Sequence, residues 1–214
     1  MTKKIYGLML HGLTSSGDKW MPIVDALQQD HFQQLECEMP NAPELPLTLM
    51  GGKRVPAWFD FQGLGPDAPR QDVEGIVAST KIIHGYLDDM IANKAGGDSK
   101  SVFLFGFSQG GMMALFAGLR YDKPLGGIIA LSTYLPLLKQ IQRREIELLQ
   151  PRDTRILYCH GDKDSLLDLE WAKQCTKVIK SFGYSNVETH WMHKLEHTTN
   201  AETLAILRNF FDQQ

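Results

Sequence analysis

One serine of this chain stands in a sequence setting typical of a catalytic nucleophile. Ser108 lies in the run Gly106-Phe107-Ser108-Gln109-Gly110, after an apolar stretch of strand length and before a helix-like stretch rich in alanine and leucine. In this G-x-S-x-G pattern a strand turns sharply into a helix, and the turn lifts the serine hydroxyl out of the chain. The flanking glycines leave room for so tight a backbone. The pattern therefore predicts that Ser108 attacks an acyl carbonyl.

Two aspartates are candidates for the carboxylate that such a serine requires. A serine hydroxyl is a poor nucleophile until an imidazole takes its proton and a carboxylate orients that imidazole. The partners are expected in the order serine, acid, histidine, each in a loop after a strand. Asp162 and Asp164 both follow the apolar run that ends at Cys159. Asp162 comes directly after Gly161 and is better placed to brace the loop, so Asp164 is the predicted acid.

Three histidines lie near the last strand, which is expected over residues 187–192. The run Thr199-Asn200-Ala201-Glu202 has the pattern of a capping box, which starts the final helix just after Thr199. His197 then lies in the loop between strand and helix, where the base belongs. His190 falls inside the strand and His193 at its end, so both are expected to be structural or exposed. The predicted base is His197.

A glycine-containing loop after the first apolar run could supply donors for an oxyanion. One donor is expected from the backbone N–H that follows the nucleophile, at Gln109, and a second from an N-terminal loop. Residues 10–17 contain His11-Gly12-Leu13 and suit that second role. A plain turn between strand and helix would explain the glycines but not the histidine-glycine pair.

The stretches around these residues alternate between short apolar runs and amphipathic segments. Such alternation is typical of an α/β fold with a mostly parallel sheet, and we expect a single domain over residues 1–214. Strands are expected at 5–10, 35–39, just before Ser108, 127–131, 155–159 and 187–192. Helices are expected from Trp20 to Leu27 with Asp18 as cap, from Asp72 to Gly96-Gly97, after Ser108, from Leu169 to Phe182, and after Thr199.

The segment from Pro40 to Arg70 breaks this alternation because it holds six of the ten prolines. Such a density excludes a regular helix or a central strand. One interpretation is a surface excursion whose Trp58 and Phe59 are buried against the domain. The other is a loop laid over the serine that supplies apolar walls for a substrate. In that case Trp58 and Leu64, together with Leu166 beyond the acid, are candidate substrate-binding residues.

Composition excludes several other classes of function. The chain has 214 residues, of which 43% are hydrophobic and 22% charged, as in ordinary globular proteins. A net charge of -3 gives no reason to expect nucleic acid as a partner. We interpret the three cysteines as reduced thiols, and no Cys/His spacing predicts a metal site, so we expect neither metal nor cofactor. No signal peptide or bilayer-spanning run is evident, so we expect a cytoplasmic protein without integral membrane association.

Taken together, these residues resemble the acyl-protein thioesterase and small carboxylesterase family, which is similar to lysophospholipases and has the α/β-hydrolase fold. The resemblance covers nearly the whole chain. It rests on the runs Leu10-His11-Gly12-Leu13, Trp58-Phe59-Asp60, Gly63-Leu64-Gly65-Pro66-Asp67, Gly106 to Gly111, Leu131-Ser132-Thr133-Tyr134-Leu135-Pro136 and His160-Gly161-Asp162-Lys163-Asp164.

The resemblance implies a mostly parallel central sheet, helices on both faces and no large cap domain. It implies Ser108 as nucleophile, Asp164 as acid and His197 as base, with oxyanion donors at Leu13 and Gln109. Two runs depart from the family pattern. Thr14-Ser15 replaces a Gly-Asp pair, and Leu167-Asp168 replaces a hydrophobic-proline pair.

The leading hypothesis is a serine hydrolase that cleaves esters or thioesters of short-to-medium acyl chains through an acyl-enzyme. Its partner is expected to be a small-molecule or acylated-protein substrate. A non-catalytic acyl- or lipid-binding protein is one alternative, although binding alone requires none of the three catalytic groups. An acyltransferase is another, because it would use the same acyl-enzyme with a different acceptor. The natural leaving group and the oligomeric state stay open.

Overall fold

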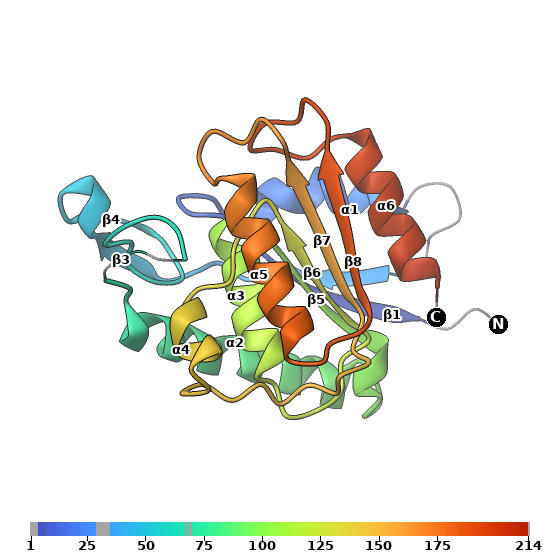
Figure 1. The fold of residues 1–214 in the computed structure, drawn as a ribbon. Coiled ribbons are helices and arrows are strands. Elements are labelled where there is room, and N and C mark those ends of the chain that lie inside the picture. Colours follow the sequence, from blue (N-terminus) through green and yellow to red (C-terminus); the bar gives the residue numbers. More distant parts are fainter. Residues whose placement is uncertain (1–3, 29–34, 67, 69, 214) are drawn as a thin grey trace.

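Six parallel strands form the central sheet (Figure 1). The computed structural model describes residues 4–28, 35–66, 68 and 70–213. Across the sheet the strands follow the order β2-β1-β5-β6-β7-β8, so β2 lies on one side of β1 and the strands from β5 to β8 lie on the other. They span Ile5–Leu10 (β1), Leu35–Glu38 (β2), Val102–Phe107 (β5), Gly127–Leu131 (β6), Ile156–Gly161 (β7) and Val187–Met192 (β8).

Helices cover both faces of this sheet, as the sequence predicts. One face carries α2 (Val73–Asn93), α3 (Gln109–Leu119), α4 (Leu138–Gln142) and α5 (Leu169–Ser181). The other face carries α1 (Met21–Gln28) and α6 (Ala201–Asp212). Within the described residues, no large cap domain covers the sheet, and the architecture is that of the α/β-hydrolase fold.

The strand sequences explain why two layers of helices are needed. Successive side chains of a strand point to opposite faces, and a parallel sheet with both faces covered is apolar throughout. Leu104 and Ile128 accordingly pack into the core under α2, α3 and α5. Their neighbours Phe103 and Ile129 pack into the core under α1 and α6. The continuous apolar runs therefore form central strands.

The long helix that was expected after Asp72 is confirmed at both ends. The Asp72 side chain accepts a hydrogen bond from the Gly75 N–H and so caps α2. At the other end the Gly97 N–H donates to the Ile91 carbonyl at 2.8 Å, and both Gly96 and Gly97 have positive φ. Glycine tolerates that conformation without a Cβ penalty, so the helix ends there.

Two other predicted caps are wrong by short distances. Asp18 lies inside a 3-10 turn, Gly17–Trp20, and α1 begins only at Met21. The Gly17 N–H at the start of this turn donates to the Asn41 side chain at 2.8 Å. The final helix is capped one residue later than predicted, by Asn200, whose side chain accepts from the Thr203 N–H. Asparagine caps a helix as well as threonine does, so the sequence pattern fitted two registers.

The proline-rich segment forms no central strand or long helix, as predicted, but it contains a hairpin that was missed. Strands β3 (Glu44–Leu47) and β4 (Lys53–Pro56) pair in antiparallel register as a separate two-stranded sheet. Pro46 and Pro56 are tolerated there because each strand has an unpaired side. Figure 1 shows the hairpin standing away from the central sheet. The five-residue helix α4 was also missed.

The loops that follow the parallel strands gather at one edge of the sheet. Figure 1 shows β7 and β8 ending at the same side, and their loops carry two of the predicted catalytic residues. Sites in such sheets lie beyond the carboxyl ends of the strands. In the part of the chain that the structure describes, no helix is long and apolar enough to cross a membrane.

Candidate active site

Ser108 lies at the turn between β5 and α3 in a strained conformation. Its φ of 54° and ψ of -121° are unusual for a residue with a side chain. The turn is so tight that a Cβ on Gly106 would lie 2.3 Å from the Gly110 carbonyl oxygen. A Cβ on Gly110 would lie 2.0 Å from the Leu10 oxygen. The glycines are therefore required by the close approach of three backbone segments.

Neighbouring strands hold this turn in place. The Ser108 N–H donates to the Leu131 carbonyl at the end of β6, at 2.9 Å. The Ser108 carbonyl accepts from the Thr133 hydroxyl at 2.8 Å. Because both partners belong to the β6 strand and its loop, the sheet stabilises the strained backbone, and the serine side chain is left free to face the cavity.

Asp164 and His197 come together across the loops after β7 and β8. Asp164 Oδ2 lies 2.7 Å from His197 Nδ1, and the aspartate side chain is completely buried. An ionised carboxylate only accepts hydrogen bonds, so the imidazole proton lies on Nδ1 and Nε2 is left to act as a base. The other carboxylate oxygen, Oδ1, accepts from the N–H groups of Leu166 and Leu167 at 3.0 and 2.9 Å.

These contacts keep the buried carboxylate ionised. Burial alone raises the pKa of a carboxyl group. The hydrogen bonds from His197 and from the Leu167 backbone outweigh that effect, so the pKa of Asp164 lies below its usual value. The carboxylate can therefore orient the imidazole and stabilise its protonated form.

The His197 ring reaches the serine turn through an aromatic contact. Its centroid lies 4.8 Å from that of Phe107, the residue before the serine. His197 and Ser108 both line one cavity of about 430 Å³. The structure thus brings together the three residues that the sequence singled out as nucleophile, acid and base.

Two backbone N–H groups near Ser108 were expected to serve as oxyanion donors. Gln109 is the first residue of α3, and the N–H groups of a first helical turn have no partner within the helix. Leu13 follows Gly12 in the loop after β1 and lines the cavity. Among the described residues, neither N–H is paired with another group. Each is therefore available as a hydrogen-bond donor.

His11 holds the loop that presents Leu13. The buried ring contacts the Gly12 carbonyl through Nδ1 at 2.7 Å and accepts the Ala42 N–H at Nε2 at 2.9 Å. A carbonyl cannot donate, so the proton lies on Nδ1 and the ring is neutral. Burial lowers the pKa of His11, which favours the same state. The histidine-glycine pair is therefore structural, joining the loop after β1 to the proline-rich segment.

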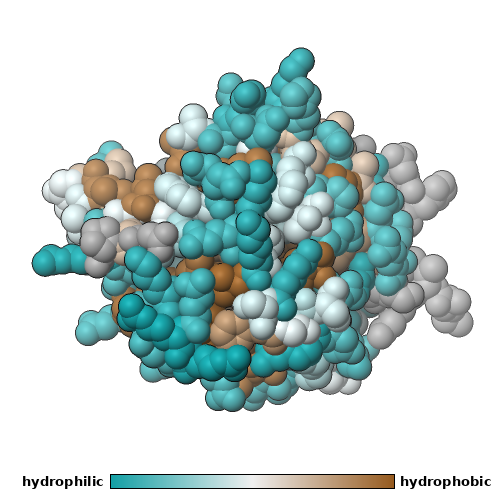
Figure 2. Space-filling model, in the orientation of Figure 1, coloured by the Kyte–Doolittle hydropathy of each residue, from teal (hydrophilic) through white to brown (hydrophobic). Residues whose placement is uncertain are grey.

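The cavity is mainly apolar, and its mouth is formed by exposed leucines. Leu64 and Leu166, both predicted to bind substrate, line it and are 47% and 59% exposed. Leu49 from the tip of the hairpin joins them. Figure 2 shows apolar side chains gathered at the end of the molecule that carries the hairpin. The cavity can therefore bury an apolar chain close to Ser108.

The comparisons with known proteins agree with this site. The model of the phospholipase/carboxylesterase family matches residues 6–214. The chain belongs to that family. Its members are serine carboxylesterases and thioesterases, and this protein is an enzyme of that kind.

Individual relatives are similar over most of their length. Acyl-protein thioesterase 1 of Candida albicans is 30% identical over 206 residues, which cover 95% of this chain and 89% of that protein. Among solved structures, SOBER1 of Arabidopsis thaliana has a TM-score of 0.87 at 27% identity, covering 98% of both chains. Acyl-protein thioesterase 2 of Zea mays has a TM-score of 0.82 at 26% identity, covering 98% of this chain and 93% of that one.

At Thr14-Ser15, where the chain departs from the family pattern, the backbone of the loop after β1 is strained. Thr14 has a φ of 60°, a left-handed conformation that glycine adopts freely and a β-branched residue does not. The Thr14 N–H donates to the Pro56 carbonyl at 2.9 Å, and this bond ties the loop to β4. Thr14 and Ser15 both line the cavity, so two hydroxyl-bearing side chains stand there in place of the glycine and the aspartate of the family pattern.

The expectation that Trp58 lines a substrate groove is wrong. Its side chain is completely buried, and the indole N–H donates to the His11 carbonyl at 2.9 Å. Its backbone N–H donates to the Gln109 side chain at 2.9 Å, and the Gln109 amide donates to the Phe59 carbonyl at 2.7 Å. These bonds hold the 58–59 segment beneath the catalytic turn. This agrees with the other interpretation of the sequence, in which Trp58 and Phe59 are buried against the domain.

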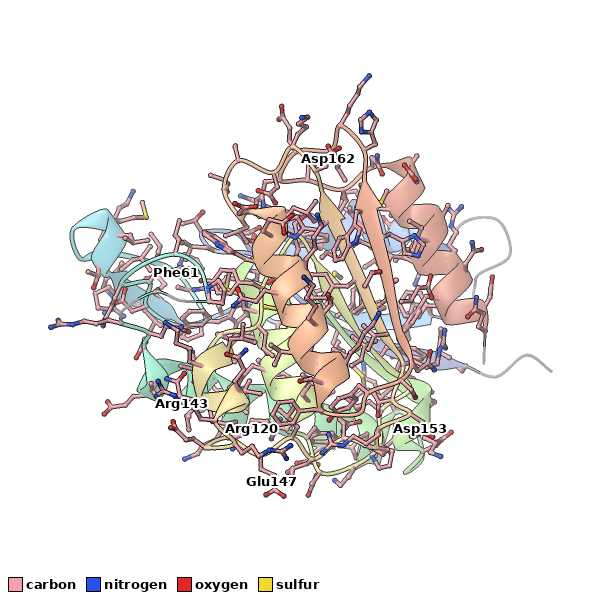
Figure 3. All side chains as sticks on the ribbon, viewed as in Figure 1. Phe61, Arg120, Arg143, Glu147, Asp153 and Asp162 are labelled. Carbon is pink, nitrogen blue, oxygen red and sulfur yellow. The ribbon has the colours of Figure 1, made fainter. Side chains whose placement is uncertain are left out.

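Several cavity residues were not singled out from the sequence. Phe61, three residues after Trp58, lines the cavity in its place and is labelled in Figure 3. Its proximity to the Trp58-Phe59 pair was the available signal. The remaining side chains come from helices, a strand end and the loop after β7, and their apolar residues look like ordinary core; they are Trp20, Phe107, Met112 and Leu167.

The two aspartates separate as expected. Asp162, labelled in Figure 3, lies beyond the ends of β7 and β8 and accepts the Lys194 N–H at 2.7 Å. It braces the turn after β8. His193 is bound to Asp162 and is largely exposed, and His190 pairs with Glu188 within β8 at 2.6 Å. Neither histidine lines the cavity.

Proposed function

We propose that this protein hydrolyses carboxylic esters or thioesters of short-to-medium acyl chains, with Ser108 as nucleophile, His197 as base and Asp164 as orienting acid. The observation that carries this proposal is the 2.7 Å contact between Asp164 Oδ2 and His197 Nδ1, made by a histidine that shares an apolar cavity with Ser108. A protein that only binds acyl chains has no need for a buried ionised carboxylate behind that histidine.

The reaction begins with attack on the acyl carbonyl. Ser108 Oγ bonds to the carbonyl carbon while its proton passes to His197 Nε2. The carbonyl oxygen becomes an oxyanion and accepts hydrogen bonds from the N–H groups of Leu13 and Gln109. Asp164 stabilises the imidazolium that forms.

The second half releases the acid. The bond to the leaving oxygen or sulfur breaks as His197 returns its proton to that atom, leaving an acyl group on Ser108. A water then gives a proton to His197 Nε2 and attacks the acyl-enzyme. The collapse of this second intermediate returns the proton to Ser108 and frees the carboxylic acid.

The shape and lining of the cavity support this substrate class. Its leucine-lined mouth and volume of about 430 Å³ favour a linear monoacyl group over branched or diacyl ones. Relatives named acyl-protein thioesterase support an acylated protein as one substrate class beside small esters. The proposed reaction uses only protein groups and water, so it requires no cofactor.

Replacement of the serine tests the proposal directly. Ser108→Ala should lower kcat/KM for an activated ester by about 10³-fold or more, because no nucleophile remains. A fluorophosphonate should label the wild-type protein at Ser108 and leave the variant unlabelled. Retention of turnover within tenfold of wild type, with contaminating esterases excluded, would show that Ser108 is not the nucleophile.

The same assay separates hydrolysis from the alternatives. A burst of alcohol or thiol followed by steady release of acid indicates a hydrolase. Binding of the ester without a burst indicates an acyl-binding protein, and transfer of the acyl group to an added alcohol in preference to water indicates an acyltransferase.

A further inference from the structure

A buried histidine lies behind the acid without touching the cavity. His160 is the fifth residue of β7, precedes Asp164 by four positions and is 1% exposed. It does not line the cavity that holds Ser108 and His197. Its Nε2 lies 3.4 Å from Asp164 Oδ2, the oxygen that also faces His197.

The protonation of this ring follows from its partners. His160 Nε2 lies 2.8 Å from the Leu167 carbonyl oxygen, which can only accept, so the hydrogen is on Nε2. His160 Nδ1 is then an unprotonated nitrogen, buried and without a hydrogen-bond partner among the described residues. Burial also lowers the pKa of His160. The ring is therefore a neutral donor with a single N–H.

The unpartnered nitrogen makes this buried histidine costly in free energy, which suggests that its N–H has a function. A buried polar atom without a partner costs free energy, whereas a phenylalanine ring would fill a similar space with no such atom. What the histidine adds is the Nε2–H, which faces the Leu167 carbonyl and the Asp164 carboxylate together. Leu167 in turn donates its N–H to Asp164 Oδ1 at 2.9 Å. The acid and the end of its loop are thus bound both to each other and to β7.

We propose that His160 is a positioning residue of this hydrolase, whose neutral Nε2–H holds the loop from Asp164 to Leu167 against β7 and thereby aims Asp164 Oδ2 at His197. The inference rests on the proposed catalytic triad. The charged or titratable groups that face the His160 ring are Asp164 in its own loop, His197 in the loop after β8, and Asp168 at the cap of α5.

Three substitutions and one control test this role. His160→Phe and His160→Leu remove the donor, while His160→Gln keeps an N–H at a similar reach. His84→Phe is the matched control, because His84 Nε2 contacts a backbone carbonyl, that of Ala117, at 2.9 Å and does not line the cavity. Rates are measured with p-nitrophenyl butyrate from pH 5 to 9 and are normalised to the folded fraction from circular dichroism.

Loss of the donor should affect kcat and the pH profile together. A misdirected carboxylate should lower kcat by about 10- to 100-fold in the Phe and Leu variants, with KM little changed. Weaker support for the His197 imidazolium should move the midpoint of the rate–pH profile toward lower pH. The Gln variant should regain most of kcat and the wild-type midpoint, and the His84 variant should match wild type. A purely structural role would scale the whole profile without moving its midpoint.

Besides a lowered kcat with an unmoved midpoint, two results would overturn the inference. One is a wild-type kcat and midpoint in the Phe and Leu variants. The other is a Gln variant that folds yet is as impaired as they are, which would assign the ring a packing role. If neither apolar variant folds, the Gln variant decides alone: near wild-type kcat and midpoint support the role, and a large loss refutes it. Failure of the proposed triad is recognised separately, because Ser108→Ala would then stay active and wild type would not be labelled.

Discussion

Asp162 and His193 form a second aspartate–histidine pair beside the first, with 2.9 Å between Asp162 Oδ2 and His193 Nδ1. The first pair, Asp164 and His197, is joined at 2.7 Å by the same atoms. Both pairs connect the loop after β7 to the loop after β8. They differ in surroundings: the His193 side chain is 76% exposed and that of His197 only 15%. Of the two histidines, His197 lines the cavity with Ser108 and His193 does not.

We therefore expect the two histidines to respond differently to truncation. His197→Ala should lower the rate of acyl transfer by about 10³-fold or more, because the proton of Ser108 then has no acceptor. His193→Ala should change it little, since it only removes an exposed contact to Asp162. The measurement is kcat/KM with an activated ester, with His190→Ala as a further control. A large loss of activity in the His193 variant, together with an active His197 variant, would show that the base is His193 and not His197.

Leu64 should set how the enzyme responds to acyl length. Each methylene that an apolar cavity buries contributes up to about 0.8 kcal/mol, or about fourfold in kcat/KM. For linear esters from acetyl to dodecanoyl, kcat/KM should rise until the cavity is filled, and Leu64→Asp should flatten that rise. Leu149→Asp is the matched control, because Leu149 is equally exposed at 46% but does not line the cavity. A steady decline from acetyl that Leu64→Asp leaves unaltered would show that no acyl chain binds there.

Thr14 should be a site where glycine stabilises the protein. Its φ of 60° strains a β-branched residue by about 1 kcal/mol or more, and glycine removes that strain at some cost in unfolded-state entropy. Thr14→Gly should therefore raise the free energy of unfolding by up to about 1 kcal/mol. Ser185→Gly, at an exposed position without positive φ, should lower it by about 0.5 kcal/mol. Urea denaturation measures both, and an equal loss in the two variants would refute the strain.

Stability should fall as the pH drops below the ordinary histidine range. Burial lowers the pKa of both His11 and His160 from the ordinary value of 6.5 in the folded protein. Below 6.5 the unfolded chain binds protons that the folded chain does not, so the free energy of unfolding decreases until the lowered folded pKa is passed. The slope reaches about 1.4 kcal/mol per pH unit for each histidine.

The His160→Leu variant isolates one of these contributions. Its free energy of unfolding, measured by urea denaturation at intervals from pH 7.5 to 5, should decrease less steeply than that of wild type. A wild-type curve that is flat over this range would mean that neither histidine is held neutral by the fold.

The sequence predicted those parts of the fold whose signals are local. The strands around Phe103 and Ile129 are continuous apolar runs, and Asp72 and Gly97 mark the two ends of α2 by caps that act within one turn. The hairpin at 44–56 was missed because Pro46 and Pro56 were read as excluding a strand. Proline excludes a strand only where both of its sides are paired, and each strand of this hairpin is paired on one side. Whether a side of a strand is unpaired depends on neighbours distant in the chain.

The site divides in the same way. The pattern around Ser108 and the order of acid and histidine are readable because each residue follows a predicted strand. The position of Trp58 depends on hydrogen bonds to His11 and Gln109, which lie 47 and 51 residues away along the chain. A large aromatic residue fits a groove or a core equally well until those partners are known. Phe61 was overlooked for the same reason.

Gln109 carries a consequence for recombination between related chains. Its main chain begins the helix behind Ser108, while its side-chain amide satisfies two peptide groups of the 58–59 segment. An exchange that transplants this segment without the glutamine, or the reverse, buries unpaired amides, so the two pieces must be inherited as one block. Crossovers between related chains are therefore best kept away from residues 57–59. The hairpin tip is constrained in a different way: Gly51 and Gly52 have open space around them, but their positive φ disfavours any residue with a side chain.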